Sequence, residues 1–84
     1  MSCVSTYEKI LRSSDVDVKY KAAHEYFNDG KFKKAADLFD HLNLLVQGLP
    51  QEDTVAFYNG LSNFKYGDYS TAETILAKFI EVYP

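Results

Sequence analysis

The sequence predicts an all-α fold in which two antiparallel helical hairpins follow a short N-terminal helix. Three observations predict it. Apolar side chains recur at helical spacing, glycines separate the helical segments, and the second half of the chain repeats the first. Each predicted helix carries an apolar stripe, and we expect it to bury that stripe against a neighbouring helix.

The internal repeat has an offset of 37 residues, which carries Gly30 onto Gly67 and Ala35 onto Ala72. Five further pairs keep the size of the side chain at this offset: Phe32 with Tyr69, Ala23 with Gly60, Phe27 with Phe64, Phe39 with Leu76, and Leu42 with Phe79. Agreement at this many positions indicates two copies of one helical unit.

Residues 1–14 precede the first copy. Tyr7, Ile10 and Leu11 supply apolar surface for a short helix, and the Ser-Ser-Asp run at 13–15 supplies a break and a cap. The segment is therefore either a short leading helix or partly disordered.

The first copy, residues 15–50, reads as two helices. The apolar stripe of its first helix is Val16, Tyr20, Ala23 and Phe27. Gly30 suits the left-handed residue that closes a helix. The stripe of its second helix is Phe32, Ala35, Ala36, Phe39, Leu42 and Val46. Gly48 and Pro50 then end that helix.

The second copy, residues 51–84, repeats this pattern. Glu52 and Asp53 favour a helix start, where the helix dipole attracts negative charge. The first stripe is Phe57, Gly60, Leu61 and Phe64, and it runs up to Gly67. Asp68 is a predicted N-cap. The second stripe is Tyr69, Ala72, Leu76, Phe79 and Tyr83, and Pro84 stands where the last helix should end.

Small residues lie in the middle of all four stripes: Ala23, Ala35, Gly60 and Ala72. Glycine inside a helix costs about 1 kcal/mol relative to alanine. We therefore expect Gly60 to mark a close approach of two helices.

Composition excludes several classes of function. Nine basic and twelve acidic residues give a net charge of −3, which does not favour a general phosphate binder. No apolar run is long enough for a membrane-spanning helix, and one cysteine with two histidines makes a poor metal site. Phosphate-binding and catalytic motifs are lacking too. We expect no cofactor, no bound metal and no enzymatic activity.

Two polar features leave alternatives open. Neither His24 nor His41 has a nucleophile or carboxylate placed to work with it, so both are expected to be structural or solvated. Lys31, Lys33 and Lys34 form a basic turn. This turn is either a solvated helix start or a contact for lipid headgroups or an acidic partner.

The glycine-separated helix pairs, with the spacing Ala35–x3–Phe39 and a closing proline, resemble the tetratricopeptide repeat (TPR). The second copy carries the motif at Gly60, Gly67, Asp68, Tyr69, Ala72, Leu76, Phe79 and Pro84, and the first at Ala23, Tyr26, Gly30, Phe32, Ala35 and Phe39. The resemblance implies a TPR-like α–α superhelix over residues 15–84. Extra residues around 47–50 depart from the pattern and imply a longer loop.

A narrower resemblance covers residues 3–32. Cys3, the segment 7–11, the break at 13–15 and the segment 19–32 resemble the start of the TPR lipoproteins of the outer-membrane β-barrel assembly machinery (BamD-like). This resemblance implies a lipid anchor at Cys3 and residence at the periplasmic face of the outer membrane. Its implied partners are barrel-assembly subunits and unfolded outer-membrane protein segments, not nucleic acid. The alternatives are a free thiol and a cytoplasmic location.

In TPR arrays the first helix of each pair lines a concave groove. Carried over to this sequence, the groove residues are Tyr20, His24, Phe27, Asn28, Phe57, Leu61, Phe64 and Lys65. This set implies an aromatic and apolar groove that suits an extended peptide. The competing interpretation is that the same aromatic residues pack between helices.

The last helix should leave part of its stripe uncovered: Leu76, Phe79, Ile80 and Tyr83. Helical repeats bury such faces against neighbours. We therefore expect either a longer parent protein or a homo-oligomer through this helix. A non-enzymatic protein-binding scaffold is the predicted function. The alternatives are a soluble TPR adaptor and a helical regulatory domain of a larger enzyme or secretion complex.

Overall fold

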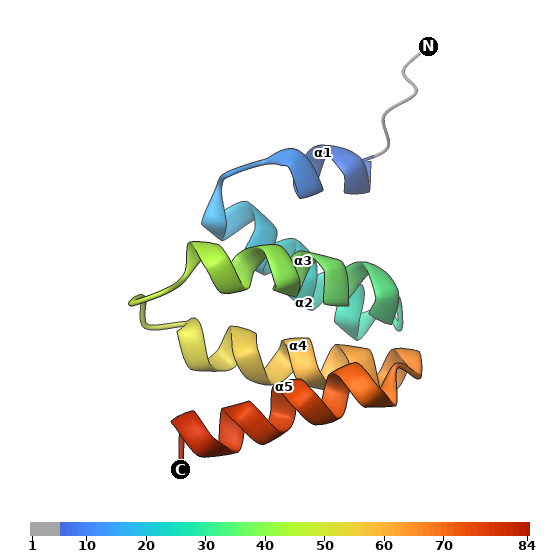
Figure 1. Cartoon of the computed structure of the whole chain (residues 1–84). Coiled ribbons are helices and arrows are strands. Elements are labelled where there is room, and N and C mark those ends of the chain that lie inside the picture. Colours follow the sequence, from blue (N-terminus) through green and yellow to red (C-terminus); the bar gives the residue numbers. More distant parts are fainter. Residues whose placement is uncertain (1–5) are drawn as a thin grey trace.

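The computed structural model describes residues 6–84, and this part of the chain contains five α-helices and no β-strand. The helices are α1 (Thr6–Arg12), α2 (Val16–Asn28), α3 (Phe32–Leu45), α4 (Glu52–Tyr66) and α5 (Tyr69–Val82), as Figure 1 shows. The predicted all-α fold is confirmed. The segment at 6–12, for which the sequence left two possibilities, is helical.

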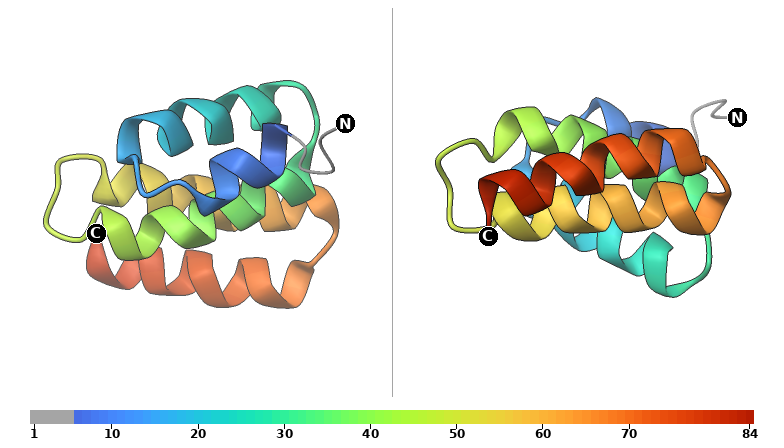
Figure 2. Two further views of the ribbon diagram at one scale, coloured as in Figure 1. Left: turned by 90° about the horizontal axis from the view of Figure 1, so that it is seen from above. Right: turned by 60° about the horizontal axis from the view of Figure 1, so that its bottom comes forward.

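The helices pack in the order of the chain. α2 pairs with α3, α3 with α4, and α4 with α5, while α1 lies against both α2 and α3 (Figures 1 and 2). The α2–α3 and α4–α5 turns lie at one end of the molecule, and the connection at residues 46–51 lies at the other. Two antiparallel hairpins are therefore stacked side by side, with α1 at one edge and α5 at the opposite edge.

Two glycines make the hairpin turns. Gly30 has φ of 79° and Gly67 has φ of 104°, the left-handed region that side chains rarely adopt. Two aspartates cap the helices as predicted: Asp15 accepts a hydrogen bond from the Val18 amide, and Asp68 from the Thr71 amide, each at 3.2 Å. The two copies of the repeat thus share the turn glycine.

The core lies between α2, α3 and α4. Its buried members are Ala22, Ala23, Ala35, Leu38, Phe39, Leu42, Val46 and Val55. The small stripe residues Ala23, Ala35 and Ala72 are all at most 2% exposed. Tyr7, Ile10 and Leu11 attach α1 to this core as half-buried side chains. In contrast, Ala72 is the only buried residue of α5, so α5 has one face on α4 and the rest in solvent.

The close approach expected at Gly60 is confirmed. A Cβ atom built on Gly60 would lie 2.5 Å from Leu76 Cδ2 and 2.6 Å from Leu76 Cγ. Real Cβ atoms do not approach other carbons this closely. The absence of a side chain at Gly60 therefore allows α4 and α5 to pack at their present distance.

Candidate functional site

Tyr58 of α4 is the centre of an aromatic cluster that joins the two hairpins. Its ring lies 4.7 Å from the ring of His24 and 5.2 Å from that of Phe27, both on α2. It also stacks on Phe39 of α3 at 5.9 Å. Edge-to-face contacts of this kind stabilise by about 0.5–1.5 kcal/mol each, beyond burial of area. Tyr58 of α4 thus covers His24, Phe27 and Phe39 of the first predicted repeat.

His24 lies inside this cluster, between the rings of Tyr20 at 4.6 Å and Phe39 at 5.2 Å. Its Nε2 atom is buried and has no hydrogen-bond partner within residues 6–84. Burial lowers the pKa of His24 below its ordinary 6.5, because the charged ring loses water that nothing replaces. The neutral imidazole therefore acts here as a packing group.

Most of the predicted groove residues of α4 lie differently, because they are exposed to solvent. Phe57 is 39% exposed and Phe64 is 51% exposed, and Leu61 between them is half-buried. Lys65 follows in the last turn of the same helix and is exposed. The second predicted repeat therefore presents apolar side chains that the first repeat keeps covered.

Residues of α5 extend this exposed area. Tyr69 packs its ring 5.3 Å from Phe64, and Phe79 packs 5.6 Å from Phe57. Tyr69 is 63% exposed and Ile80 is 68% exposed. We call Phe57, Phe64, Tyr69 and Ile80 the α4–α5 apolar surface.

The eight predicted groove residues thus divide into two groups. Tyr20, His24 and Phe27 are half-buried around Tyr58, whereas Asn28 lies exposed at the end of α2. Of the α4 members, Phe57 contacts Phe79 and Phe64 contacts Tyr69, both on α5. Sequence reasoning missed Tyr58, although it follows Phe57 directly. With two adjacent aromatic residues, helical periodicity alone does not decide which one turns toward α2.

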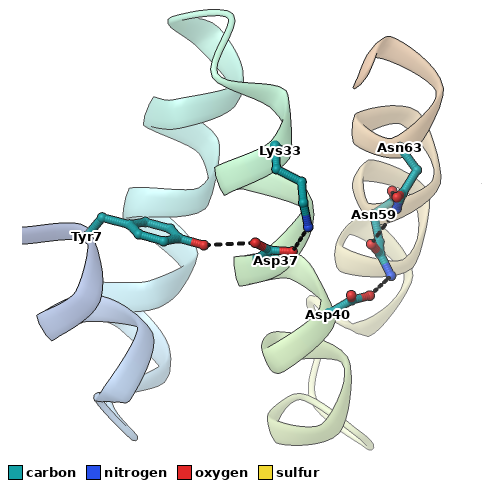
Figure 3. A network of polar contacts seen from close by, with 6 residues as sticks. All are labelled: Tyr7, Lys33, Asp37, Asp40, Asn59 and Asn63. Carbon is teal, nitrogen blue, oxygen red and sulfur yellow. Dashed lines mark hydrogen bonds and ion pairs between the residues drawn. The ribbon is translucent and has the colours of Figure 1, made fainter. Parts of the chain in front are cut away.

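Sequence reasoning also missed a polar contact between α3 and α4, drawn in Figure 3. Asn59 Nδ2 donates to Asp40 Oδ1 at 3.0 Å, and Asn63 Nδ2 donates to the backbone oxygen of Asn59 at 2.8 Å. Asn59 is only 2% exposed, so its amide requires such partners. The Asn59–Asp40 hydrogen bond joins the second hairpin to the first, and the Asn63–Asn59 hydrogen bond lies within α4.

A second polar contact holds α1 (Figure 3). The Tyr7 hydroxyl donates to Asp37 Oδ2 at 3.1 Å, and Lys33 Nζ donates to Asp37 Oδ1 at 2.7 Å. Burial, together with the Asp37 carboxylate, raises the pKa of the Tyr7 phenol. Buried Lys19 of α2 adds to this attachment, because its Nζ donates to the Leu11 carbonyl oxygen at 2.7 Å.

Three further features complete the description. The proposed anchor Cys3 lies outside the described residues. Within residues 6–84 no group of histidine, cysteine and acidic side chains is placed to hold a metal ion. Across the same residues, none of the helices combines the length and the hydropathy needed to cross a bilayer.

Comparisons of the chain with protein-family models, with curated proteins and with solved structures find no match. The surfaces described above are therefore the basis for a functional conclusion.

Proposed function

We propose that this protein is a non-enzymatic scaffold with TPR-like helical hairpins, and that it binds apolar segments of other proteins. The observation that carries the proposal is the α4–α5 apolar surface, where Phe64 is 51% and Ile80 is 68% exposed. Phe64 contacts Tyr69 and Phe57 contacts Phe79 across the α4–α5 boundary, and exposed apolar side chains gathered in this way mark sites of interaction with other proteins. A rigid surface of packed helices also lowers the entropy cost of capturing a segment.

The internal repeat supports the same conclusion. In the first hairpin, Phe27 contacts Phe32 at 5.2 Å, and Tyr58 lies over Phe27. At the same offset in the second hairpin, Phe64 contacts Tyr69 at 5.3 Å. Phe64 and Tyr69 are exposed where Phe27 and Phe32 are half-buried. In the first hairpin, this pair of rings binds the side chain of Tyr58 through Phe27. The equivalent pair on the α4–α5 apolar surface, Phe64 and Tyr69, can therefore bind an aromatic side chain in the same way.

The test is a calorimetric titration of the full chain with peptides from the C-termini of outer-membrane barrel proteins. The double variant Phe57→Ala, Phe64→Ala should bind at least about 10-fold more weakly, because truncating aromatic anchors costs more than 1 kcal/mol each. A matched control is Val18→Ala, Leu44→Ala, which truncates two exposed apolar residues elsewhere. Equal affinity of the double variant and the control, with helicity intact, contradicts the proposal.

The narrower proposal is that the scaffold is the N-terminal region of an outer-membrane assembly lipoprotein at the periplasmic face. It rests on the resemblance of residues 3–32 alone. In cells that express the natural gene, a labelled fatty acid should be incorporated into the protein, and Cys3→Ser should abolish the label. An unlabelled protein in the soluble fraction indicates the soluble adaptor instead.

A further inference from the structure

The end of the molecule that carries the two hairpin turns has a recess lined by lysines. The turn at 29–31, the start of α3, the end of α4 and the start of α1 all lie at this end (Figure 1). Four of the nine basic residues of the chain gather here: Lys31, Lys33, Lys34 and Lys65. With Phe32 and Tyr66 they line a shallow recess of about 460 Å³. We call these four lysines the lysine tip.

Aromatic rings hold the lysine side chains in place. Lys34 Nζ lies 5.4 Å from the Tyr7 ring centroid and 5.6 Å from that of Tyr26. Lys31 Nζ lies 5.9 Å from Tyr26, and Lys33 Nζ lies 5.8 Å from Tyr66. Such cation–π contacts restrict long side chains while their ammonium groups remain in water. The positive charges of Lys31, Lys33 and Lys34 are therefore ordered before any ligand arrives.

The lysines at the start of α3 lower the stability of that helix. Lys31 is the N-cap of α3, its side chain makes no capping hydrogen bond, and the first turn has no acidic residue. Helix starts favour acidic or small polar side chains and disfavour cations. At the equivalent place of the second hairpin, Asp68 does cap α5. The two residues share one backbone conformation, with φ, ψ of −90°, 68° for Lys31 and −87°, 74° for Asp68.

Acidic side chains also lie at this end of the molecule. Asp37 pairs with Lys33 at 2.7 Å, and that hydrogen bond raises the pKa of Lys33. Asp29 and Asp68 also lie in the turns. Glu8 in the first turn of α1 and Glu25 in the last turn of α2 lie at this end as well, whereas Asp15, Asp17, Glu52, Asp53 and Glu81 lie at the opposite end. None of these acidic residues lines the recess, whose charged lining residues are the four lysines.

We propose that the lysine tip binds the surface of a bilayer that contains anionic phospholipids. Lysines attract anionic headgroups, and a tyrosine beside them suits the boundary between water and lipid. Tyr66 fits this role, because it lines the recess and is 52% exposed. The lysine tip surrounds a shallow recess at an end formed by turns, so its ammonium groups can meet a flat surface. The exposed tyrosine beside these lysines favours a bilayer over an acidic peptide. The proposal does not depend on the proposed function.

The test uses the full chain with Cys3→Ser, so that no acyl chain contributes, in co-sedimentation with vesicles. The protein should bind phosphatidylglycerol vesicles and not phosphatidylcholine vesicles, and added salt should weaken the binding. The variant Lys31→Gln, Lys34→Gln, Lys65→Gln should bind on the order of 100-fold more weakly, since each lysine near the surface contributes about a 5- to 10-fold effect. Lys33 is left in place because it pairs with Asp37.

The matched control removes the same number of positive charges elsewhere, as Arg12→Gln, Lys21→Gln, Lys78→Gln. Under the proposal this control keeps nearly all of the binding. If both variants lose binding equally, only net charge matters and the proposal is overturned. It is also overturned if polyglutamate binds the lysine tip while phosphatidylglycerol vesicles do not. Circular dichroism of each variant confirms that helicity is unchanged.

Discussion

His24 is a neutral histidine enclosed by the rings of Tyr20, Phe39 and Tyr58, with a buried Nε2 that has no partner within residues 6–84. Since its pKa in the folded chain lies below the ordinary 6.5, the unfolded chain binds the proton more readily. The stability that His24 contributes is therefore complete above about pH 6.5 and is lost as pH falls through the lower, folded value.

Denaturant unfolding at about pH 7.5 and about pH 5 should show this loss in the wild-type chain. His24→Leu, which places the residue of the equivalent position Leu61, should reduce the difference between the two pH values. His41→Gln is the control, because it removes the other histidine and should leave the His24 contribution in place. An unchanged pH dependence in His24→Leu would show that its ring is not the group responsible.

Gly60 is the second residue whose role follows from its contacts. Gly60→Ala gains about 1 kcal/mol of helix propensity, but the new methyl group overlaps Leu76 and overpacking costs about 1–3 kcal/mol. We expect the free energy of unfolding to fall by about 1 kcal/mol in urea titrations.

The matching experiment is a double-mutant cycle with Leu76→Ala. In that background the overlap is gone, so Gly60→Ala should become neutral or stabilise by up to about 1 kcal/mol. Additive effects of the two substitutions would mean that the α4–α5 contact does not restrict Gly60.

The N-cap of α3 is a lysine, although its backbone has the conformation of Asp68, the aspartate that caps α5. Lys31→Asp should therefore add the cap that Asp68 provides for α5. We expect a gain of about 1 kcal/mol in unfolding free energy, which corresponds to roughly 4–8 °C in Tm for a chain of this size. Thermal unfolding measures it. Asp68→Ala should lose a similar amount, and the same sign for both substitutions would refute the equivalence of the two helix starts.

At the scale of elements, the sequence predicted most of the fold. Helix ends follow from local chemistry, so Gly30, Gly67, Asp15 and Asp68 could be assigned their roles without coordinates. The rotation of α4 could not be predicted in this way. It depends on the buried amide of Asn59, which must reach Asp40 on another helix, and that contact places Tyr58 against α2.

Aromatic side chains of the first hairpin are covered by the second hairpin, whereas Phe64 and Tyr69 of the second hairpin are exposed. This difference decides how much of the candidate site could be predicted. Periodicity paired Phe27 with Phe64 and Phe32 with Tyr69, but it missed Tyr58. It could not say that the aromatic side chains of the first copy would be covered, because the covering residue Tyr58 comes from the other hairpin. The same logic leaves Phe64 and Tyr69 open, since residues 6–84 contain no third hairpin.

An open surface of this kind has a consequence for the isolated chain. Water disfavours contiguous apolar side chains, so two copies should associate weakly through their α4–α5 apolar surfaces as the concentration rises. Ile80→Lys should keep the chain monomeric without loss of stability, because Ile80 is 68% exposed. Leu44→Lys is the control, since Leu44 is 76% exposed on α3 and should leave association unchanged. Sedimentation velocity over a range of concentrations separates these outcomes. A wild-type chain that stays monomeric throughout, or a Leu44→Lys effect as large as that of Ile80→Lys, contradicts the role of this surface.

A peptide that binds the same surface should also dissociate the wild-type dimer, because the peptide and the second copy of the chain compete for Phe64 and Ile80.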